Sequence, residues 1–140
     1  MILFDTSVLS RVFRRTRPGQ DEDRLRRVFG GLMASDAQLG LPGIVLQEVL
    51  SGIRSNREFG DLRSKLLAAF TIVSEGAAEH IEAARVRNVG LAKGLNVSGA
   101  DCLIAACAIC GGHEIFTVDE DFKAIARHAP LRLFTGSHIA

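Results

Sequence analysis

The sequence is poor in aromatic residues and has no long apolar run. Its 140 residues include eight phenylalanines but no tryptophan and no tyrosine, which disfavours a single-stranded RNA reader built on stacked aromatic side chains. No run of about 18 apolar residues suggests a membrane span, and the opening apolar run, 1–4, is too short for the core of a signal peptide. We therefore expect a protein with neither a membrane segment nor a signal peptide.

Cysteine is also scarce. Cys102, Cys107 and Cys110 are odd in number and lie in one apolar stretch, so a disulfide framework of the secreted type is not indicated. Cys107 and Cys110 have C-x-x-C spacing, but no second pair or nearby histidine cluster completes a zinc site. We expect these cysteines to pack as small buried side chains in a reducing, cytoplasmic setting.

Positive and negative charges nearly balance over the whole sequence, but they are distributed unevenly along it. The chain has 17 basic and 16 acidic residues, for a net charge of +1. Residues 11–27 hold only three acidic residues against seven arginines: Arg11, Arg14, Arg15, Arg17, Arg24, Arg26 and Arg27. Clustered arginine indicates either a solvated helix face or a patch that faces phosphate groups. The pattern alone leaves both interpretations open.

Length and hydrophobic periodicity predict one α/β domain. A chain of 140 residues with 47% hydrophobic residues has the size and apolar content of a single folded domain. Short apolar runs predict strands at 1–4, 38–41, 71–73, 114–118 and 131–134. Helical spacing and capping residues predict helices from 6 and from 21, the latter loosened by glycines 30–31, and at 44–54, 57–70, 77–93, 98–110 and 119–128. This alternation predicts a central, mainly parallel sheet of four or five strands.

Four carboxylates occupy positions that suit a metal site. Asp5 ends the first strand, Asp119 follows the strand near 115–118, and Glu48 and Asp101 interrupt apolar helices. In parallel sheets, ligands bind beyond the carboxyl ends of the strands. Several ionised carboxylates converge only where a cation neutralises them or some are protonated, and oxygen ligands without histidine favour Mg²⁺ or Mn²⁺ over zinc. Such an ion can activate water against a phosphodiester, which is nuclease chemistry.

Each of these carboxylates also has a plainer interpretation. Asp5 could cap the helix that follows it, and Asp101 fits the third helical position of a capping box. Glu48 lies opposite the apolar stripe of its helix, as a solvated residue would, and Asp119 opens an acidic helix start that the helix dipole favours. Individually these positions indicate little, so their joint order carries the argument.

That order resembles a known family. The motifs are Asp-Thr-Ser-Val-Leu at 5–9, Glu48, Gly-Ala-Asp-Cys-Leu-Ile-Ala-Ala at 99–106 and Phe-Thr-Val-Asp-Glu-Asp-Phe at 116–122. In order and spacing they resemble the PIN-domain nucleases, and the chain is similar in size to the VapC-type toxins of type II toxin–antitoxin pairs. The resemblance spans about the whole chain. It implies a single PIN domain over 1–140, with a three-layer α/β/α fold and metal-dependent endoribonuclease activity.

The resemblance also implies which residues form the site. Asp5, Glu48, Asp101 and Asp119 would hold one or two Mg²⁺ or Mn²⁺ ions for RNA cleavage. Thr117 would steady the site through a hydroxyl hydrogen bond.

The last motif offers two acidic residues for one role. We favour Asp119 as the ligand because it lies two residues after Thr117, on the same side of an extended strand. Asp121 would then support the site from beside it or serve as helix N-terminal charge. Thr6, next to the first carboxylate, is expected in the same supporting role.

Partners are implied in the same way. The resemblance implies a homodimer and a small cognate antitoxin that wraps the groove and blocks the site. We interpret Arg11, Arg14, Arg15 and Arg17 as candidate contacts with RNA or a partner.

One alternative function stays open: a catalytically idle PIN-like module for protein or RNA binding. The four matched carboxylates argue against it, because a scaffold has no need of them. A haloacid dehalogenase phosphatase would need a second aspartate where Ser7 stands.

Overall fold

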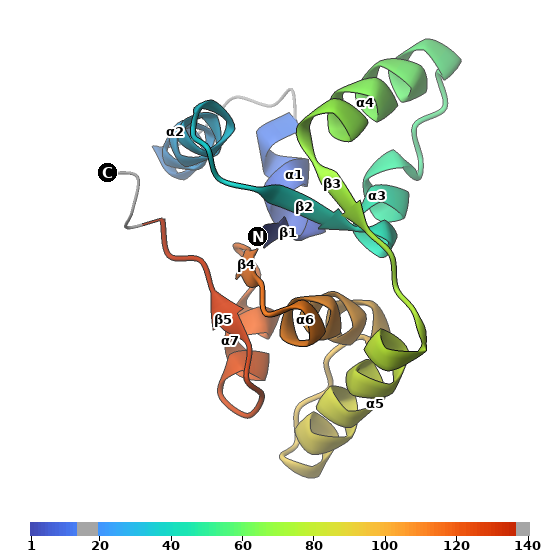
Figure 1. The fold of residues 1–140 in the computed structure, drawn as a ribbon, viewed down its shortest axis with the longest axis vertical. Helices are drawn as coiled ribbons and strands as arrows, with labels where there is room; N and C mark the ends of the chain where they lie inside the picture. Colours follow the sequence, from blue (N-terminus) through green and yellow to red (C-terminus); the bar gives the residue numbers. More distant parts are fainter. Residues whose placement is uncertain (14–19, 137–140) are drawn as a thin grey trace.

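The computed structural model describes residues 1–13 and 20–136 (Figure 1). Its strands are β1 (Ile2–Phe4), β2 (Leu39–Pro42), β3 (Thr71–Val73), β4 (Glu114–Phe116) and β5 (Arg132–Leu133). Its helices are α1 (Thr6–Phe13), α2 (Gln20–Ala34), α3 (Gly43–Leu50), α4 (Asn56–Ala69), α5 (Ala77–Ala92), α6 (Gly99–Gly111) and α7 (Glu120–Ala126). Three of the arginines named above, Arg14, Arg15 and Arg17, lie outside the described residues.

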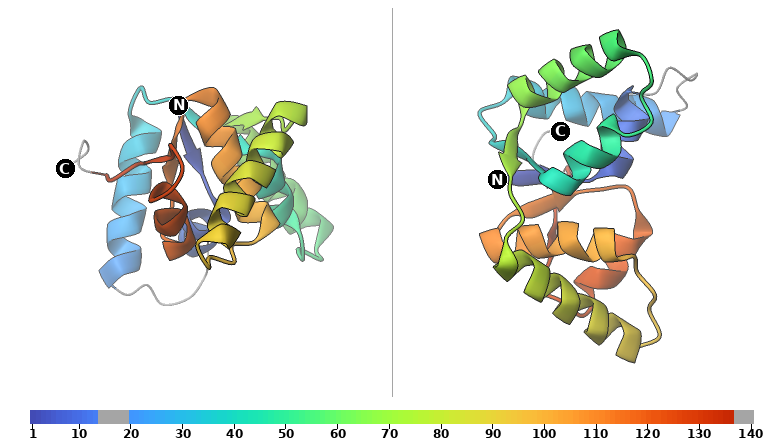
Figure 2. Two further views of the ribbon diagram at one scale, coloured as in Figure 1. Left: turned by 90° about the horizontal axis from the view of Figure 1, so that it is seen from below. Right: turned by 90° about the vertical axis from the view of Figure 1, so that its right-hand side faces the viewer.

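The five strands form one parallel sheet in the order β3-β2-β1-β4-β5. Leu3 of β1 lies opposite Gly40 of β2 and Ile115 of β4. Right-handed crossovers place α1–α4 on one face of the sheet and α5–α7 on the other, as the right-hand view of Figure 2 shows. The prediction of a three-layer α/β/α fold around a parallel sheet is confirmed, and the continuously apolar sequence of β1 follows from burial on both faces.

The core is built around the central strand. Leu3 and Phe4 are fully buried, and the Phe4 ring packs edge-on against Phe29 of α2 and Phe70, with centroid distances of 5.7 and 5.1 Å. It also packs against Phe116 of β4 at 5.2 Å. Because β1 and β4 are neighbours with buried ends, the residues that follow them, including Asp5, are held on a rigid support.

Two helix predictions were wrong in detail. The helix predicted over 44–54 ends at Leu50, because Ser51 adopts an extended conformation, with its hydroxyl on the Gln47 carbonyl, and Gly52 has a φ of 86°. Helix α2 continues through glycines 30–31 to Ala34, since burial of Leu32 holds its last turns on the core. Tertiary packing thus outweighs the low helix propensity of glycine.

The cysteines are all free, and their burial differs along α6. Cys102 and Cys107 are buried as predicted, whereas Cys110 is exposed because it lies at the end of the helix. Among the residues that the structure describes, no helix is long and apolar enough to cross a membrane.

Candidate active site

Asp5 is the buried carboxylate at the end of β1, only 2% exposed. Its backbone N–H donates to the Phe116 carbonyl at 3.3 Å, which joins it to β4. The carboxylate accepts hydrogen bonds from the Ser7 hydroxyl at 2.8 Å, the Thr117 hydroxyl at 2.7 Å and the Val8 N–H at 3.3 Å. Burial raises the pKa of Asp5, while these hydrogen bonds favour the charged form and oppose the shift.

Ser7 and Thr117 tie the loop after β1 to the loop after β4. The Thr117 hydroxyl donates to Asp5 and accepts from the Asp119 N–H at 2.9 Å. The Ser7 hydroxyl accepts from the Val118 N–H at 3.2 Å. Thr117 therefore orders both Asp5 and Asp119, in the way that the resemblance implied. Ser7 had no role in the site predicted from the sequence, although its position two residues after Asp5 was an available signal.

Three carboxylates meet beside this network. Oxygen atoms of Asp101, Asp119 and Asp121 all lie within 4.8 Å of one another. Asp101 is placed by the first turn of α6, where its N–H donates to the Ser98 hydroxyl at 3.1 Å, the cap that the sequence predicted. Asp119 caps α7 by accepting from the Asp121 N–H at 3.0 Å. The N-terminal ends of α6 and α7 thus bring the three carboxylates together.

The carboxylates of the cluster disfavour one another's charge. Burial, followed by the negative charge of Asp119, raises the pKa of Asp101 to about 6, and Asp121 and Asp5 add to this effect. Asp119 also raises the pKa of Asp5. A set of ligands that is all carboxylate oxygen, and whose members repel one another, fits a hard divalent ion such as Mg²⁺ or Mn²⁺.

The remaining site predictions concern Asp121, Glu48 and Thr6. Both Asp119 and Asp121 belong to it, so the structure does not choose between them. The carboxylate of Glu48 is exposed and accepts a hydrogen bond from the Thr6 hydroxyl at 3.1 Å. Glu48 lies outside the group of three carboxylates. Its hydrogen bond with Thr6 joins α3 to the start of α1.

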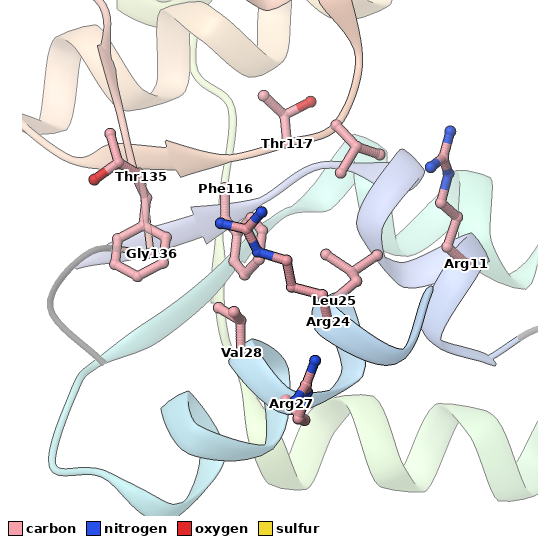
Figure 3. Close-up of a pocket in the computed structure, with 11 residues that line it drawn as sticks. Arg11, Arg24, Leu25, Arg27, Val28, Phe116, Thr117, Thr135 and Gly136 are labelled. Carbon is pink, nitrogen blue, oxygen red and sulfur yellow. The ribbon is translucent and has the colours of Figure 1, made fainter. Parts of the chain in front are cut away.

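A cavity of about 690 Å³ adjoins Thr117 (Figure 3). Arg11, which the sequence singled out, lines it together with Arg24 and Arg27 of α2. Arg24 and Arg27 belong to the arginine-rich segment 11–27. Nothing in the sequence singles them out among its seven arginines.

This arrangement of carboxylates occurs in a chain that matches a known family. A family model, the PIN domain, matches residues 2–128. The chain belongs to the PIN domain family. No curated protein sequence matches it significantly.

Solved structures with this PIN fold match along nearly their whole length. A chain of FitAcB from Neisseria gonorrhoeae is 22% identical with a TM-score of 0.75, and the match covers 99% of each chain. A chain of VapBC2 from Rickettsia felis, bound to a DNA fragment from its promoter, is 20% identical with a TM-score of 0.74, covering 96% of this chain and 98% of that one. VapC20 of Mycobacterium tuberculosis, described as a Sarcin-Ricin loop cleaving toxin, is 16% identical with a TM-score of 0.70, covering 94% and 99%.

Proposed function

We propose that this PIN domain is a metal-dependent endoribonuclease and the toxin of a VapC-type toxin–antitoxin pair. The observation that carries the proposal is the group of three carboxylates within 4.8 Å of one another, beside the buried Asp5 at the carboxyl end of the parallel sheet. Membership of the PIN family supports a nuclease, and the toxins among the structural neighbours support the toxin role.

Asp101, Asp119 and Asp121 would hold the Mg²⁺ or Mn²⁺ ion, with Asp5 beside them and Glu48 at the edge. When bound, the ion supplies positive charge that offsets the carboxylates and polarises the phosphodiester. Ser7 and Thr117 keep Asp5 oriented by donating to it, and these hydrogen bonds favour its charged form.

Asp101 couples cation binding to a proton. With a pKa of about 6 in the protein alone, Asp101 is partly protonated in mildly acidic solution. Metal ligands must be deprotonated, so binding displaces that proton and weakens as the pH falls below about 6.

The partners follow from the same proposal. Several of the similar structures are toxin–antitoxin complexes, some of them bound to DNA. We therefore expect a small cognate antitoxin, a homodimer, and an RNA substrate in the cytoplasm, where three free cysteines are stable.

The test is cleavage of total RNA by the purified protein with Mg²⁺, with Mn²⁺ and with EDTA. We expect metal-dependent fragments from the wild type, and none from the Asp5→Asn or Asp101→Asn variants. Glu120→Gln is the matched control, because Glu120 is an exposed acid in the first turn of α7, paired with Lys123 at 3.0 Å rather than with the cluster. This control should cleave like the wild type.

Two results would contradict the proposal. Cleavage by Asp101→Asn at the wild-type rate would remove that residue from the site. Absence of both cleavage and Mn²⁺ binding by calorimetry would favour the alternative, an idle PIN-like interaction module. Binding of Mn²⁺ without cleavage would keep the metal site and direct the search to a narrower RNA substrate.

A further inference from the structure

The cavity beside Thr117 has a charged side and an apolar side. The guanidinium groups of Arg11, Arg24 and Arg27 supply the charge. Figure 3 shows the Arg24 side chain extending from α2 toward Phe116. Among the side chains that the structure describes, those of residues 1–13 and 22–136, none forms an ion pair with these three arginines, and none that lines the cavity is acidic. The charged side therefore offers positive charge to a ligand.

The apolar side is formed by Leu25 and Val28 of α2 together with Phe116 and Phe134. The two phenylalanine rings pack on each other with centroids 5.2 Å apart and are only 7% and 8% exposed, so they close the floor of the cavity. A volume of about 690 Å³ lies within the usual range of small-ligand sites, about 300–1,000 Å³. The space is thus large enough for one nucleotide, with an apolar surface for a base.

The cavity and the carboxylate cluster share a wall. Thr117 lines the cavity, and its hydroxyl bonds both Asp5 and the Asp119 N–H. Thr117 is thus common to the wall of the cavity and to the hydrogen-bond network of the carboxylates. Without a cation, the carboxylates would repel the phosphates of an RNA chain, whereas the arginines would attract them.

We propose that this cavity holds one unpaired nucleotide of single-stranded RNA, next to the phosphodiester that is cleaved. Its phosphate faces Arg24 and Arg27, and its base lies against Val28 and the planar guanidinium of Arg24, a surface on which bases stack. The proposal rests on the proposed function for the identity of the substrate. The link through Thr117 to the carboxylates of the proposed nuclease site favours RNA over an acidic peptide, which the same charge would also attract.

The experiment measures the affinity of a fluorescein-labelled single-stranded RNA 12-mer of mixed sequence by anisotropy, in EDTA, so that no metal-dependent cleavage interferes. Arg24→Gln should weaken binding about tenfold, the effect of losing one charge-assisted contact, and lower the slope of log affinity against log salt by about 0.7. Arg63→Gln, which removes an exposed arginine from α4, is the matched control and should change neither quantity.

A second variant tests the apolar side without changing charge. Val28→Phe adds volume at a half-buried position of the cavity wall, so it should weaken binding of the single-stranded 12-mer while keeping the salt slope. The same RNA as a duplex has no unpaired base to insert, so its affinity should be unaffected by Val28→Phe. Circular dichroism melting of each variant confirms that it is folded.

The outcomes separate this proposal from the nuclease proposal. Equal affinities for Arg24→Gln and Arg63→Gln, or a folded Val28→Phe that binds the 12-mer like the wild type, would overturn the nucleotide site even if the wild type cleaves RNA. Weakened binding in both cavity variants supports the site even if the wild type shows no metal-dependent cleavage. Absence of wild-type binding at low salt would overturn the site outright, and an acidic peptide would then be the ligand to try.

Discussion

Replacing Asp101 by asparagine should stabilise the protein in EDTA while removing its response to metal. Burial and the charges of Asp119 and Asp121 disfavour the ionised form of Asp101, which raises its pKa to about 6. Asparagine keeps the shape and the helix N-terminal position but carries no charge. The ionised carboxylate of Asp101 therefore lowers the stability of the protein alone, and the proposed cation would offset that loss.

The magnitude follows from Coulomb's law. At the 4.8 Å that bounds the cluster, each carboxylate pair repels by about 1 kcal/mol in water and about 3.5 kcal/mol at an effective dielectric of 20. Asp121 is exposed and Asp119 half-buried, so solvent screening favours the lower value, or about 2 kcal/mol for the two pairs. Loss of the favourable charge at the start of α6 subtracts about 0.3–1 kcal/mol. We expect a net gain of about 1 kcal/mol, or about 3–5 °C in Tm.

The gain should depend on pH with a definite sign. In the unfolded chain Asp101 loses its proton near pH 3.9, whereas in the folded chain it does so near pH 6. Between these values the unfolded state has already released the proton that the folded state retains, so the stability of the wild type falls as the pH rises through this window. The advantage of Asp101→Asn should be absent below about pH 4 and complete above about pH 7.

The assay is thermal melting of both proteins in EDTA from pH 4 to pH 8, repeated at pH 7.5 with Mg²⁺. An ion at a hundred times its Kd stabilises by about 2.7 kcal/mol, so Mg²⁺ should raise the Tm of the wild type far more than that of the variant. Glu120→Gln, the matched loss of one charge in a first helical turn, should not be stabilised in EDTA. A lower Tm for Asp101→Asn than for the wild type at pH 7.5 in EDTA would refute the repulsion argument.

Two further predictions concern the fold that supports the site. Thr117→Val should lower the free energy of unfolding by about 1–3 kcal/mol, because it leaves the Asp119 N–H without its partner and removes one of the hydrogen bonds that the buried Asp5 carboxylate accepts; Thr6→Val, which loses an exposed bond, should cost clearly less in urea titration, and equal costs would contradict the reasoning. Gly30→Ala, inside α2 with open space around the added Cβ, should stabilise by about 0.5–1 kcal/mol, whereas Gly112→Ala, at a φ of 67°, should destabilise by about 1–2 kcal/mol. The same sign for both glycine variants would refute the conformational argument.

Local patterns predicted most of the elements of this PIN domain. Short apolar runs marked all five strands, and the runs of β1, β2 and β4 are nearly unbroken because these strands are buried within the sheet. The cap at Ser98 was also read correctly, since a capping box depends on residues three positions apart. The end of α3 was missed because the helical pattern continues beyond Leu50, and only the conformation of Ser51 and Gly52 stops it.

The sequence by itself determined the fold class, because alternating strands and helices with buried apolar faces leave few other ways to cover a parallel sheet. It also named the carboxylates, since each stands at an element end or interrupts an apolar helix. Only the tertiary structure decided which of them meet: Asp101 joins both Asp119 and Asp121, while Glu48 remains outside. It also decided that Ser7 holds Asp5, and that Arg24 and Arg27 face a cavity at Thr117. These contacts join segments distant along the chain, and their distances depend on how α2, α6 and the strands pack in space, which no local pattern of residues specifies.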